Sequence, residues 1–309
     1  MLPLRNGLDR TTTNRSAPVT STAATSTRVH LPLAGAAAPR PTALEVDGLR
    51  RVFLARNGGV VEALSGVSVT VGQGEVVAVL GPSGCGKSSL LRILAGLDGD
   101  FSGGIRWNLE DSDPQSASRR LRSATVFQSD STFPWMSIAN NMRVGMSGLT
   151  LDAAEVQRRT ERYLSLVGLG KFHNAYPHEL SGGMRQRVAI ARALATEPLL
   201  LLMDEPLAAL DAQTRLVMQE ELLRIWREAR STVVYVTHDI GEALVLADRV
   251  VVMSARPGRI KAIRDVPFGA NRTVMQVRSA PEFGVLESEL WGLVAEEVGQ
   301  SLAKPNGGA

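Results

Sequence analysis

The chain has 309 residues, of which 44% are apolar and 21% are charged, and its formal net charge is +3. This length and balance are typical of a globular protein with one large or two modest domains. Residues 1–43 hold five arginines and one aspartate, a charge of +4, so the remainder carries 3 − 4 = −1. A folded part with so little net charge argues against a nucleic-acid-binding surface.

Two further bulk features restrict the setting. Apolar runs such as 199–203 are far shorter than the roughly 20 residues that a membrane-spanning helix needs, and the first residues lack the apolar core of a secretory signal. The single cysteine, Cys85, excludes an internal disulfide and fits a reducing cytosol.

Residues 1–43 are rich in Ser, Thr, Ala and Pro and contain no aromatic residue, so we expect a disordered tail. An arginine-rich, acid-poor start is also compatible with an organelle transit peptide. The composition favours the flexible tail.

The first chemical motif follows a continuous apolar run at 76–80, which predicts a buried parallel strand. It continues as Gly81-Pro82-Ser83-Gly84-Cys85-Gly86-Lys87-Ser88 and then as a helical pattern over 89–97. Strand, glycine loop and helix in this order form the context of a phosphate-binding loop. We expect backbone N–H groups to cradle the phosphates of a nucleoside triphosphate, Lys87 to reach the β- and γ-phosphates, and Ser88 to ligate Mg²⁺.

Polar side chains follow three other predicted strands. Asp204 and Glu205 close the strand 199–203, His238 comes after 232–236, and Gln128 comes after 124–127. The carboxyl ends of parallel strands meet at one edge of a sheet, where ligands bind. We therefore expect Asp204 on the metal, Glu205 as the general base and His238 at the γ-phosphate.

A second glycine pair precedes another helical pattern, which ends before Pro198. Ser181 is expected to cap this helix, and Gly182 and Gly183 would leave its first N–H groups open to an anion. In isolation the same residues would form a plain helix cap.

Together these motifs resemble the ATP-binding cassette (ABC) ATPase family over roughly residues 44–268. The resemblance implies an α/β fold: a P-loop NTPase cassette with a RecA-like core, an antiparallel β subdomain and a helical subdomain at about 132–182. It also implies a head-to-tail dimer in which each ATP site combines residues of both chains. Leu210-Asp211 matches the family's D-loop, and neither Met184 nor Ala208, where the family more often has Gln and Ser, removes a phosphate or metal ligand.

The resemblance also assigns roles by position. One chain would bind ATP through Phe53 at the adenine and through Gly81, Pro82, Ser83, Gly84, Cys85, Gly86, Lys87, Ser88 and Ser89, and the second through Ser181, Gly182, Gly183 and Gln186. Mg²⁺ would be held by Ser88, Gln128 and Asp204. Catalysis would involve Glu205, His238 and Gln128.

Within the family, Phe133-Pro134-Trp135 and the stretches 84–86, 180–187, 238–244 and 254–260 resemble the importer cassettes for nitrate, sulfonates, taurine and related small anions. This implies an ATPase on the cytoplasmic face of the cell membrane with separate permease subunits and, indirectly, a periplasmic or extracellular substrate-binding protein, and without nucleic acid. Two alternatives remain: a soluble ABC protein of DNA repair or translation, and a nucleotide-sensing or regulatory ATPase without a permease.

Two expectations concern the remaining residues. Phe283, Leu286, Leu290 and Val294 lie at helical spacing and predict a helix that packs on the cassette, within an extension (269–309) of about 41 residues, too short for an added regulatory domain. Cys85 stands at a helix N-terminus near Lys87, which predicts a lowered thiol pKa and inactivation by maleimide with protection by ATP.

Overall fold

The computed structural model describes residues 40–54, 58–109, 123–129 and 131–303. Most of the predicted tail, residues 1–39, therefore lies outside the described residues. Residues 40–43, which were assigned to the tail, belong to the fold: strand β1 (Thr42–Leu54) begins there, and Arg40 pairs with Asp248 at 2.8 Å.

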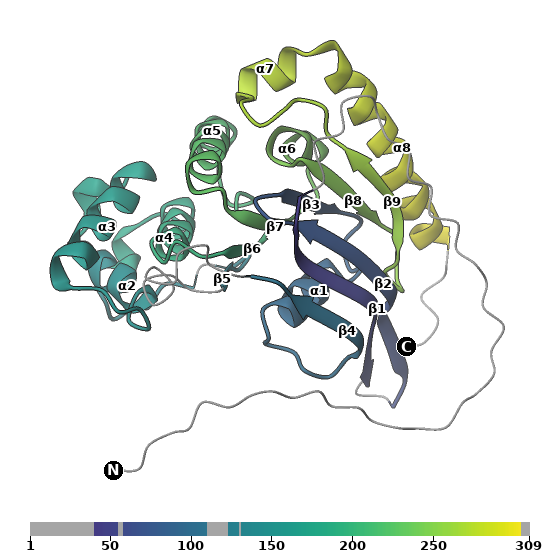
Figure 1. Ribbon diagram of the computed structural model, residues 1–309, viewed down its shortest axis with the longest axis horizontal. Helices are drawn as coiled ribbons and strands as arrows, with labels where there is room; N and C mark the ends of the chain where they lie inside the picture. The colour runs from purple at the N-terminus through teal and green to yellow at the C-terminus, as the bar shows by residue number, and fades with distance from the viewer. Residues whose placement is uncertain (1–39, 55–57, 110–122, 130, 304–309) are drawn as a thin grey trace.

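The core is a six-stranded sheet in the order β5-β6-β7-β3-β8-β9 (Figure 1). Its strands are β5 (Ser123–Val126), β6 (Leu200–Asp204), β7 (Thr232–Thr237), β3 (Val76–Leu80), β8 (Arg249–Met253) and β9 (Ile260–Asp265). All neighbouring pairs are parallel except β8 and β9. The carboxyl ends of β5, β6, β7 and β3 therefore lie along one edge, as the motifs required.

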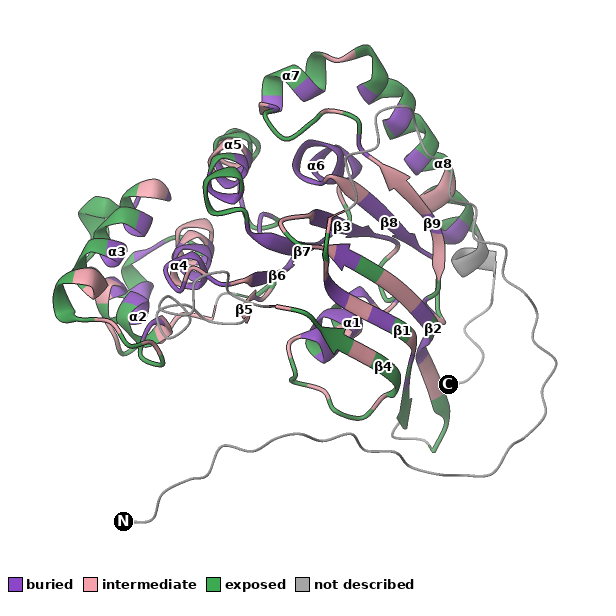
Figure 2. Ribbon diagram, in the orientation of Figure 1, coloured by how far each residue is buried: buried purple, intermediate pink, exposed green. Residues whose placement is uncertain are grey.

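The central strands β6, β7 and β3 are buried along their whole length because both faces of the sheet are covered. In β7, Val233 and Tyr235 belong to one hydrophobic cluster, whereas Val234 and Val236 belong to the other. This alternation follows from the pleat, which points successive side chains to opposite faces. Figure 2 shows the buried strands between two covering layers.

One layer contains α1 (Lys87–Leu94) and a three-stranded antiparallel sheet in the order β2-β1-β4. The other two strands of this sheet are β2 (Val60–Gly72) and β4 (Ser102–Trp107). Apolar residues of α1, β1 and β2 share one cluster with β3 and β8. The opposite layer contains α5 (Ala212–Ala229), α6 (Ile240–Leu246), α7 (Val274–Ser279) and α8 (Pro281–Ala303).

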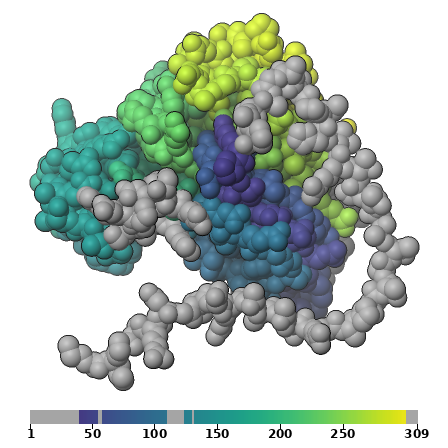
Figure 3. All heavy atoms as spheres, in the orientation of Figure 1, coloured from purple at the N-terminus to yellow at the C-terminus, as the bar shows by residue number. Residues whose placement is uncertain are grey.

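The helical part of the chain lies between β5 and β6 in sequence. It consists of α2 (Ile138–Gly145), α3 (Ala153–Leu166), α4 (Gly182–Leu194) and the short 3₁₀ helices η2 (Gly170–Phe172) and η3 (Pro177–Glu179). In Figure 3 it forms a teal lobe that projects to one side of the molecule. Helix α4 joins this lobe to the core, because Val188 and Ile190 lie in the same cluster as β6 and β7.

The C-terminal helix is confirmed. Phe283, Leu286 and Leu290 are buried, and Val294 packs partly buried against the same cluster as α6 and α7. Helix α8 thus seals one face of the core. Among the helices of the described residues, none combines the length and the apolar composition that crossing a membrane requires.

Candidate functional site

The predicted phosphate loop lies between β3 and α1, with two glycines in the left-handed region. Gly84 has φ 75° and Gly86 has φ 103°. A Cβ on Gly86 would stand 2.7 Å from Leu64 Cδ2 and 2.8 Å from the carbonyl oxygen of Ala63. Only glycine therefore fits at the start of α1, and these contacts keep the loop in a curved conformation.

Lys87 is the cation of this loop. Its side chain is 6% exposed, and its Nζ donates to the carbonyl oxygens of Gly81 at 2.7 Å and Pro82 at 3.0 Å. The first turn of α1 contains no acidic side chain. Within the part of the chain that the structure describes, the hydrogen bonds of Lys87 to oxygen go to carbonyl groups, which an anion entering the loop can replace.

Asp204 at the end of β6 faces this loop. Burial raises the pKa of Asp204, while the Ser88 hydroxyl, which donates a hydrogen bond to the carboxylate, partly opposes the rise. Among the described residues, Oδ1 of Asp204 is buried and has no hydrogen-bond partner. An orphaned buried carboxylate oxygen beside a serine hydroxyl is what a hard cation with oxygen ligands would satisfy.

The site fits a Mg²⁺ ion that has only a few protein ligands. No group of three or more His, Cys, Asp or Glu side chains with metal-binding geometry occurs in the described ranges. Mg²⁺ commonly uses one or two protein oxygens together with substrate phosphates and water. Ser88 and Asp204 supply such a pair, so the fit is to a cation that arrives with a nucleotide.

Two of the predicted side chains converge on one atom of a third. Gln128 Nε2 donates to Glu205 Oε2 at 3.1 Å, and His238 Nδ1 lies 3.1 Å from the same oxygen. The three side chains come from the ends of β5, β6 and β7, so the sheet edge brings them together as expected. Their arrangement surrounds a carboxylate that can accept a proton.

The backbone of Glu205 is held in an uncommon conformation. Its φ is 45°, and its N–H donates to the carbonyl oxygen of Val236 in β7 at 2.9 Å. The N–H of Ala208 in turn donates to the carbonyl oxygen of Glu205 at 3.2 Å. A left-handed non-glycine residue at this place, over-determined by its neighbours, is typical of functional sites.

The second glycine pair opens α4 as predicted. Ser181 is the N-cap, and its hydroxyl accepts from the N–H of Met184 at 3.3 Å. Ser181 and Gly182 are exposed, and the first turn of α4 carries no acidic side chain. Gly183 lies against Leu210, since a Cβ there would be 3.1 Å from its Cδ2. The exposed turn has the features that an anion site at a helix N-terminus requires, and its role stays a prediction.

Gln186 has a contact that the sequence did not reveal. It is 2% exposed, and its Nε2 donates to the carbonyl oxygen of Phe127, the residue before Gln128, at 3.1 Å. The prediction placed Gln186 at the nucleotide of a second chain. That role stays a prediction, and within its own chain the residue is bonded to the residue that follows β5.

Phe53 lies one residue before the end of β1 and is 38% exposed. The guanidinium of Arg51 lies 4.2 Å from its ring centroid and covers one face. The other face is the one that could stack on a base, so its assignment to adenine stays a prediction.

The expectation for Cys85 is wrong. The thiol is 1% exposed, and burial raises its pKa, with Lys87 opposing more weakly. Helix position and a neighbouring ammonium do not lower a thiol pKa when the sulfur is enclosed by protein. Its predicted rapid reaction with maleimide does not follow from this environment.

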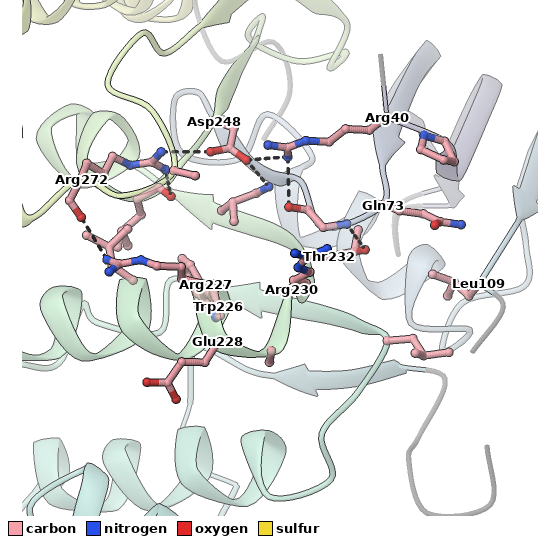
Figure 4. A pocket seen from close by; sticks show the side chains of 18 of the residues that line it. Arg40, Gln73, Leu109, Trp226, Arg227, Glu228, Arg230, Thr232, Asp248 and Arg272 are labelled. Atoms are coloured by element: carbon pink, nitrogen blue, oxygen red, sulfur yellow. Dashed lines mark hydrogen bonds and ion pairs between the residues drawn. The ribbon is translucent and has the colours of Figure 1, made fainter. Parts of the chain in front are cut away.

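A cavity of about 800 Å³ lies at the opposite edge of the sheet, where β3 and β7 begin (Figure 4). Inside it Asp248 accepts hydrogen bonds from Arg40 at 2.8 Å and Arg272 at 3.0 Å. Although burial opposes it, these two guanidinium groups hold the pKa of Asp248 below its ordinary value. This cavity is separate from the strand ends that carry the predicted chemistry.

Comparison with known proteins agrees with the site. A protein-family profile described as ABC transporter matches residues 64–208. An uncharacterised ABC transporter ATP-binding protein of Methanocaldococcus jannaschii is 42% identical over 259 residues, which cover 84% of this chain and 94% of the relative. The chain belongs to the ABC transporter ATP-binding family.

Other members of the family have more specific names. A taurine import ATP-binding protein of Jannaschia sp. is 40% identical, covering 82% of this chain and 94% of the relative. An aliphatic sulfonates import ATP-binding protein of Bacillus cereus is 38% identical, with 82% and 99% covered. A solved dimeric ATP-binding cassette in a post-hydrolysis state, bound to ADP and Pi, is 30% identical with a TM-score of 0.63, covering 72% of this chain and 98% of that one.

These findings confirm the predicted family, the cassette fold and the ABC ATPase activity class. The geometry adds that the phosphate loop, Asp204, Glu205, Gln128 and His238 share one edge of the sheet. The roles of the individual residues stay predictions.

Proposed function

We propose that the chain is the ATP-hydrolysing subunit of an ABC importer and works as a head-to-tail dimer with separate membrane subunits. The observation that carries this proposal is the meeting of Gln128 and His238 at Oε2 of Glu205, beside the Ser88–Asp204 pair. A site of this composition is suited to activating a water molecule next to a bound triphosphate.

Nucleotide binding would begin at the loop. The N–H groups of residues 84–88 and the open start of α1 would receive the phosphates. Lys87 would exchange the carbonyl oxygens of Gly81 and Pro82 for phosphate oxygens, a change that replaces neutral partners by anionic ones. Mg²⁺ bound with the nucleotide would be held by Ser88, Asp204 and Gln128 and would neutralise charge on the phosphates.

Hydrolysis would then depend on Glu205. As a carboxylate it would take the proton of the attacking water, while Gln128, 3.1 Å away, would help to orient that water. His238 is 62% exposed at the same oxygen, so its ring has room to contact the γ-phosphate. Each of these proposed roles uses a side chain that lies at the end of a core strand, with Gln128 and His238 next to Glu205.

The exposed turn of α4 supports the dimer. Ser181 and Gly182 offer backbone N–H groups to the exterior, while Gly183 lies against the turn of Ala209 and Leu210. A partner subunit could place its own loop-bound ATP against this turn and receive the same contact in return. That reciprocity closes a two-fold dimer.

Mixing two inactive variants tests the composite site. Ser181→Arg blocks the turn of one chain, and Glu205→Gln removes the base of the other. In a mixed dimer, one site then has an intact turn and an intact base, and the second site has neither. Random mixing before ATP is added should restore about a quarter of wild-type activity, since half the dimers are mixed and each has one intact site.

The control replaces the Glu205→Gln chain by a chain that carries both substitutions. Mixed with Ser181→Arg, it leaves no intact turn, and activity should stay at background. Equal activity in the two mixtures, or activity of Ser181→Arg alone at the wild-type rate, contradicts the head-to-tail arrangement.

An aromatic surface on the helical lobe supports a membrane partner. Trp135 is 70% exposed and its ring centroid is 5.7 Å from that of Phe133. Arg192 lies 5.4 Å from the Phe133 ring and Asn141 binds its backbone, so the surface is rigidly supported. A large exposed aromatic residue on a fixed base is suited to an interface.

We further propose that the imported substrate is a small sulfonate or related anion, because relatives at about 40% identity are named for taurine and aliphatic sulfonates. The chain should be purified from membranes with its native permease and reconstituted in liposomes. Taurine, an alkanesulfonate and nitrate are then compared as stimulants of ATP hydrolysis in the presence of the binding protein.

The expected result is stimulation by one of these anions and its loss in Trp135→Ala, with Phe172→Ala as a control for another exposed aromatic residue of the lobe. Recovery of the chain with nucleic acid, or as a membrane-free assembly, would instead support a soluble maintenance or regulatory ATPase.

A further inference from the structure

The exposed ring of His238 does little to fix the position of this residue. The ring is 62% exposed and lies 3.1 Å from Glu205 Oε2. Its place beside Glu205 therefore depends on the backbone that follows β7. A buried threonine before His238 and a partly exposed aspartate after it hold that backbone.

The residue before His238 makes the first link. Thr237 is 1% exposed, and its hydroxyl oxygen accepts from the N–H of Asp239 at 3.0 Å. The same hydroxyl donates to Glu242 Oε2 at 2.5 Å. One side chain thus joins the residues on either side of His238 to a carboxylate on α6.

The residue after His238 makes the second link. Asp239 caps α6, and its Oδ1 accepts from the N–H of Glu242 at 2.8 Å. Its other oxygen, Oδ2, lies 3.6 Å from Arg215 on α5. The loop of His238 is therefore attached to α6 at both ends.

Burying the carboxylate of Glu242 at this place costs desolvation free energy. Glu242 is 4% exposed, and burial raises its pKa despite hydrogen bonds from Thr237 and Tyr235. The hydroxyl of the fully buried Tyr235 donates to Oε1 at 2.7 Å. An apolar side chain on this face of α6 would avoid the desolvation cost, so stability alone does not account for a carboxylate.

We propose that Glu242 is a positioning residue that holds His238 at Glu205 through the hydroxyl of Thr237. Glu242 is enclosed beneath the loop, where it acts on the site through other residues. This inference rests on the proposed function only in giving His238 a catalytic role. The geometric part concerns the place of the ring.

Thr237→Val is the most selective variant because it keeps the shape of the side chain and removes only the hydroxyl. It leaves Glu242 Oε2 without one donor and the N–H of Asp239 without its acceptor. Displacement of a catalytic group by about 1 Å costs on the order of 100-fold in rate. We expect kcat to fall by at least about tenfold, with KM for ATP unchanged within about twofold.

Two variants accompany it. Thr237→Ser retains the hydroxyl, so its kcat should stay within about threefold of wild type. Thr160→Val removes another buried threonine hydroxyl, which donates to the carbonyl oxygen of Val156 within α3, and should leave kcat unchanged. Equal kcat values for Thr237→Val and Thr237→Ser overturn the proposal.

The position of the ring is measured independently by NMR of protein labelled with ¹⁵N in its four histidines. The His238 signal is assigned from its loss in His238→Ala. It should move in nucleotide-free Thr237→Val and stay in place in Thr160→Val, with the other three histidine signals unchanged. An unmoved His238 signal in Thr237→Val overturns the positioning role, even where kcat falls.

The two measurements separate this inference from the proposed function. Failure of the wild-type chain to hydrolyse ATP contradicts the proposed catalytic roles, whereas the NMR comparison still decides whether the Thr237 hydroxyl, which bonds both Glu242 and Asp239, positions the ring.

Discussion

Glu205→Gln separates basicity from shape at the centre of the site. Both neighbouring side chains, Gln128 and His238, approach the same atom, Oε2, at 3.1 Å. An amide oxygen in that place can keep both contacts, while its NH₂ group occupies the place of Oε1. The strained backbone at Glu205 is held by main-chain hydrogen bonds, which the substitution leaves intact.

The expected loss is therefore the contribution of a positioned general base. This contribution is about 10²–10⁴-fold in rate, which corresponds to about 2.7–5.4 kcal/mol of activation free energy at about 1.36 kcal/mol per tenfold. We expect kcat for phosphate release to fall by at least about 100-fold. ATP affinity should change by less than about threefold, because Lys87 and the loop are untouched.

The assay combines phosphate release at saturating ATP with binding of a fluorescent ATP analogue and size-exclusion chromatography. Glu221→Gln is the control, since Glu221 pairs with Arg224 on the surface of α5. Bound ATP should shift the Glu205→Gln protein, and not the control, to a lasting dimer. Retention of more than a third of the wild-type kcat would falsify the assignment of Glu205 as base.

Three further outcomes are expected. Leu290→Ala should lower the free energy of unfolding by about 2–5 kcal/mol in a denaturant titration, because Leu290 is fully buried. Val285→Ala, at an exposed site of the same helix, should change it by less than about 0.5 kcal/mol. Similar losses for the two variants would contradict the packing of α8. Native Cys85 should react with maleimide at least about tenfold more slowly than in unfolded chain, since a raised pKa and burial both reduce the accessible thiolate; equal rates would contradict the enclosure. Because the folded pKa of Asp248 is depressed, its stabilisation is complete above the unfolded pKa of about 3.9 and is lost as pH falls through the folded value, so Asp248→Asn should flatten the acid limb of the stability curve; parallel curves would contradict the ion pairs.

The sequence predicted well which strand ends share one edge of the sheet, because the signals for them are local. The apolar run that ends in Asp204-Glu205 predicts a buried strand and, at the end of that strand, a pair of carboxylates. The same holds for β3 and the glycine loop, where the strand 76–80 was predicted with the bounds that the structure has. Parallel strands then place the loop, Asp204 and His238 at one edge without further information.

Long-range contacts were out of reach for the same reason. The bond from Gln186 to the carbonyl oxygen of Phe127 joins residues 59 positions apart, and the ion pair of Arg40 with Asp248 joins residues 208 positions apart. No local sequence pattern around Gln186 or Arg40 predicts the residue that it contacts. The error at Cys85 has a related cause, because the loop position was visible in the sequence and the enclosure of the sulfur was not.

The fold gives the exposed turn of α4 a short route to the carboxylate that would activate water. Gln186, in the second turn of α4, donates to the carbonyl oxygen of Phe127, and the next residue, Gln128, donates to Glu205. On the other side of the turn, Gly183 lies against Leu210, whose carbonyl oxygen accepts from Arg215, and Arg215 faces Asp239 beside His238. A displacement of α4 relative to the core sheet must therefore strain the links to both Gln128 and His238. Both side chains meet at Oε2 of Glu205, so the surroundings of this carboxylate depend on the position of α4 relative to the core sheet. A nucleotide held between α4 of one chain and the loop of another would fix that position.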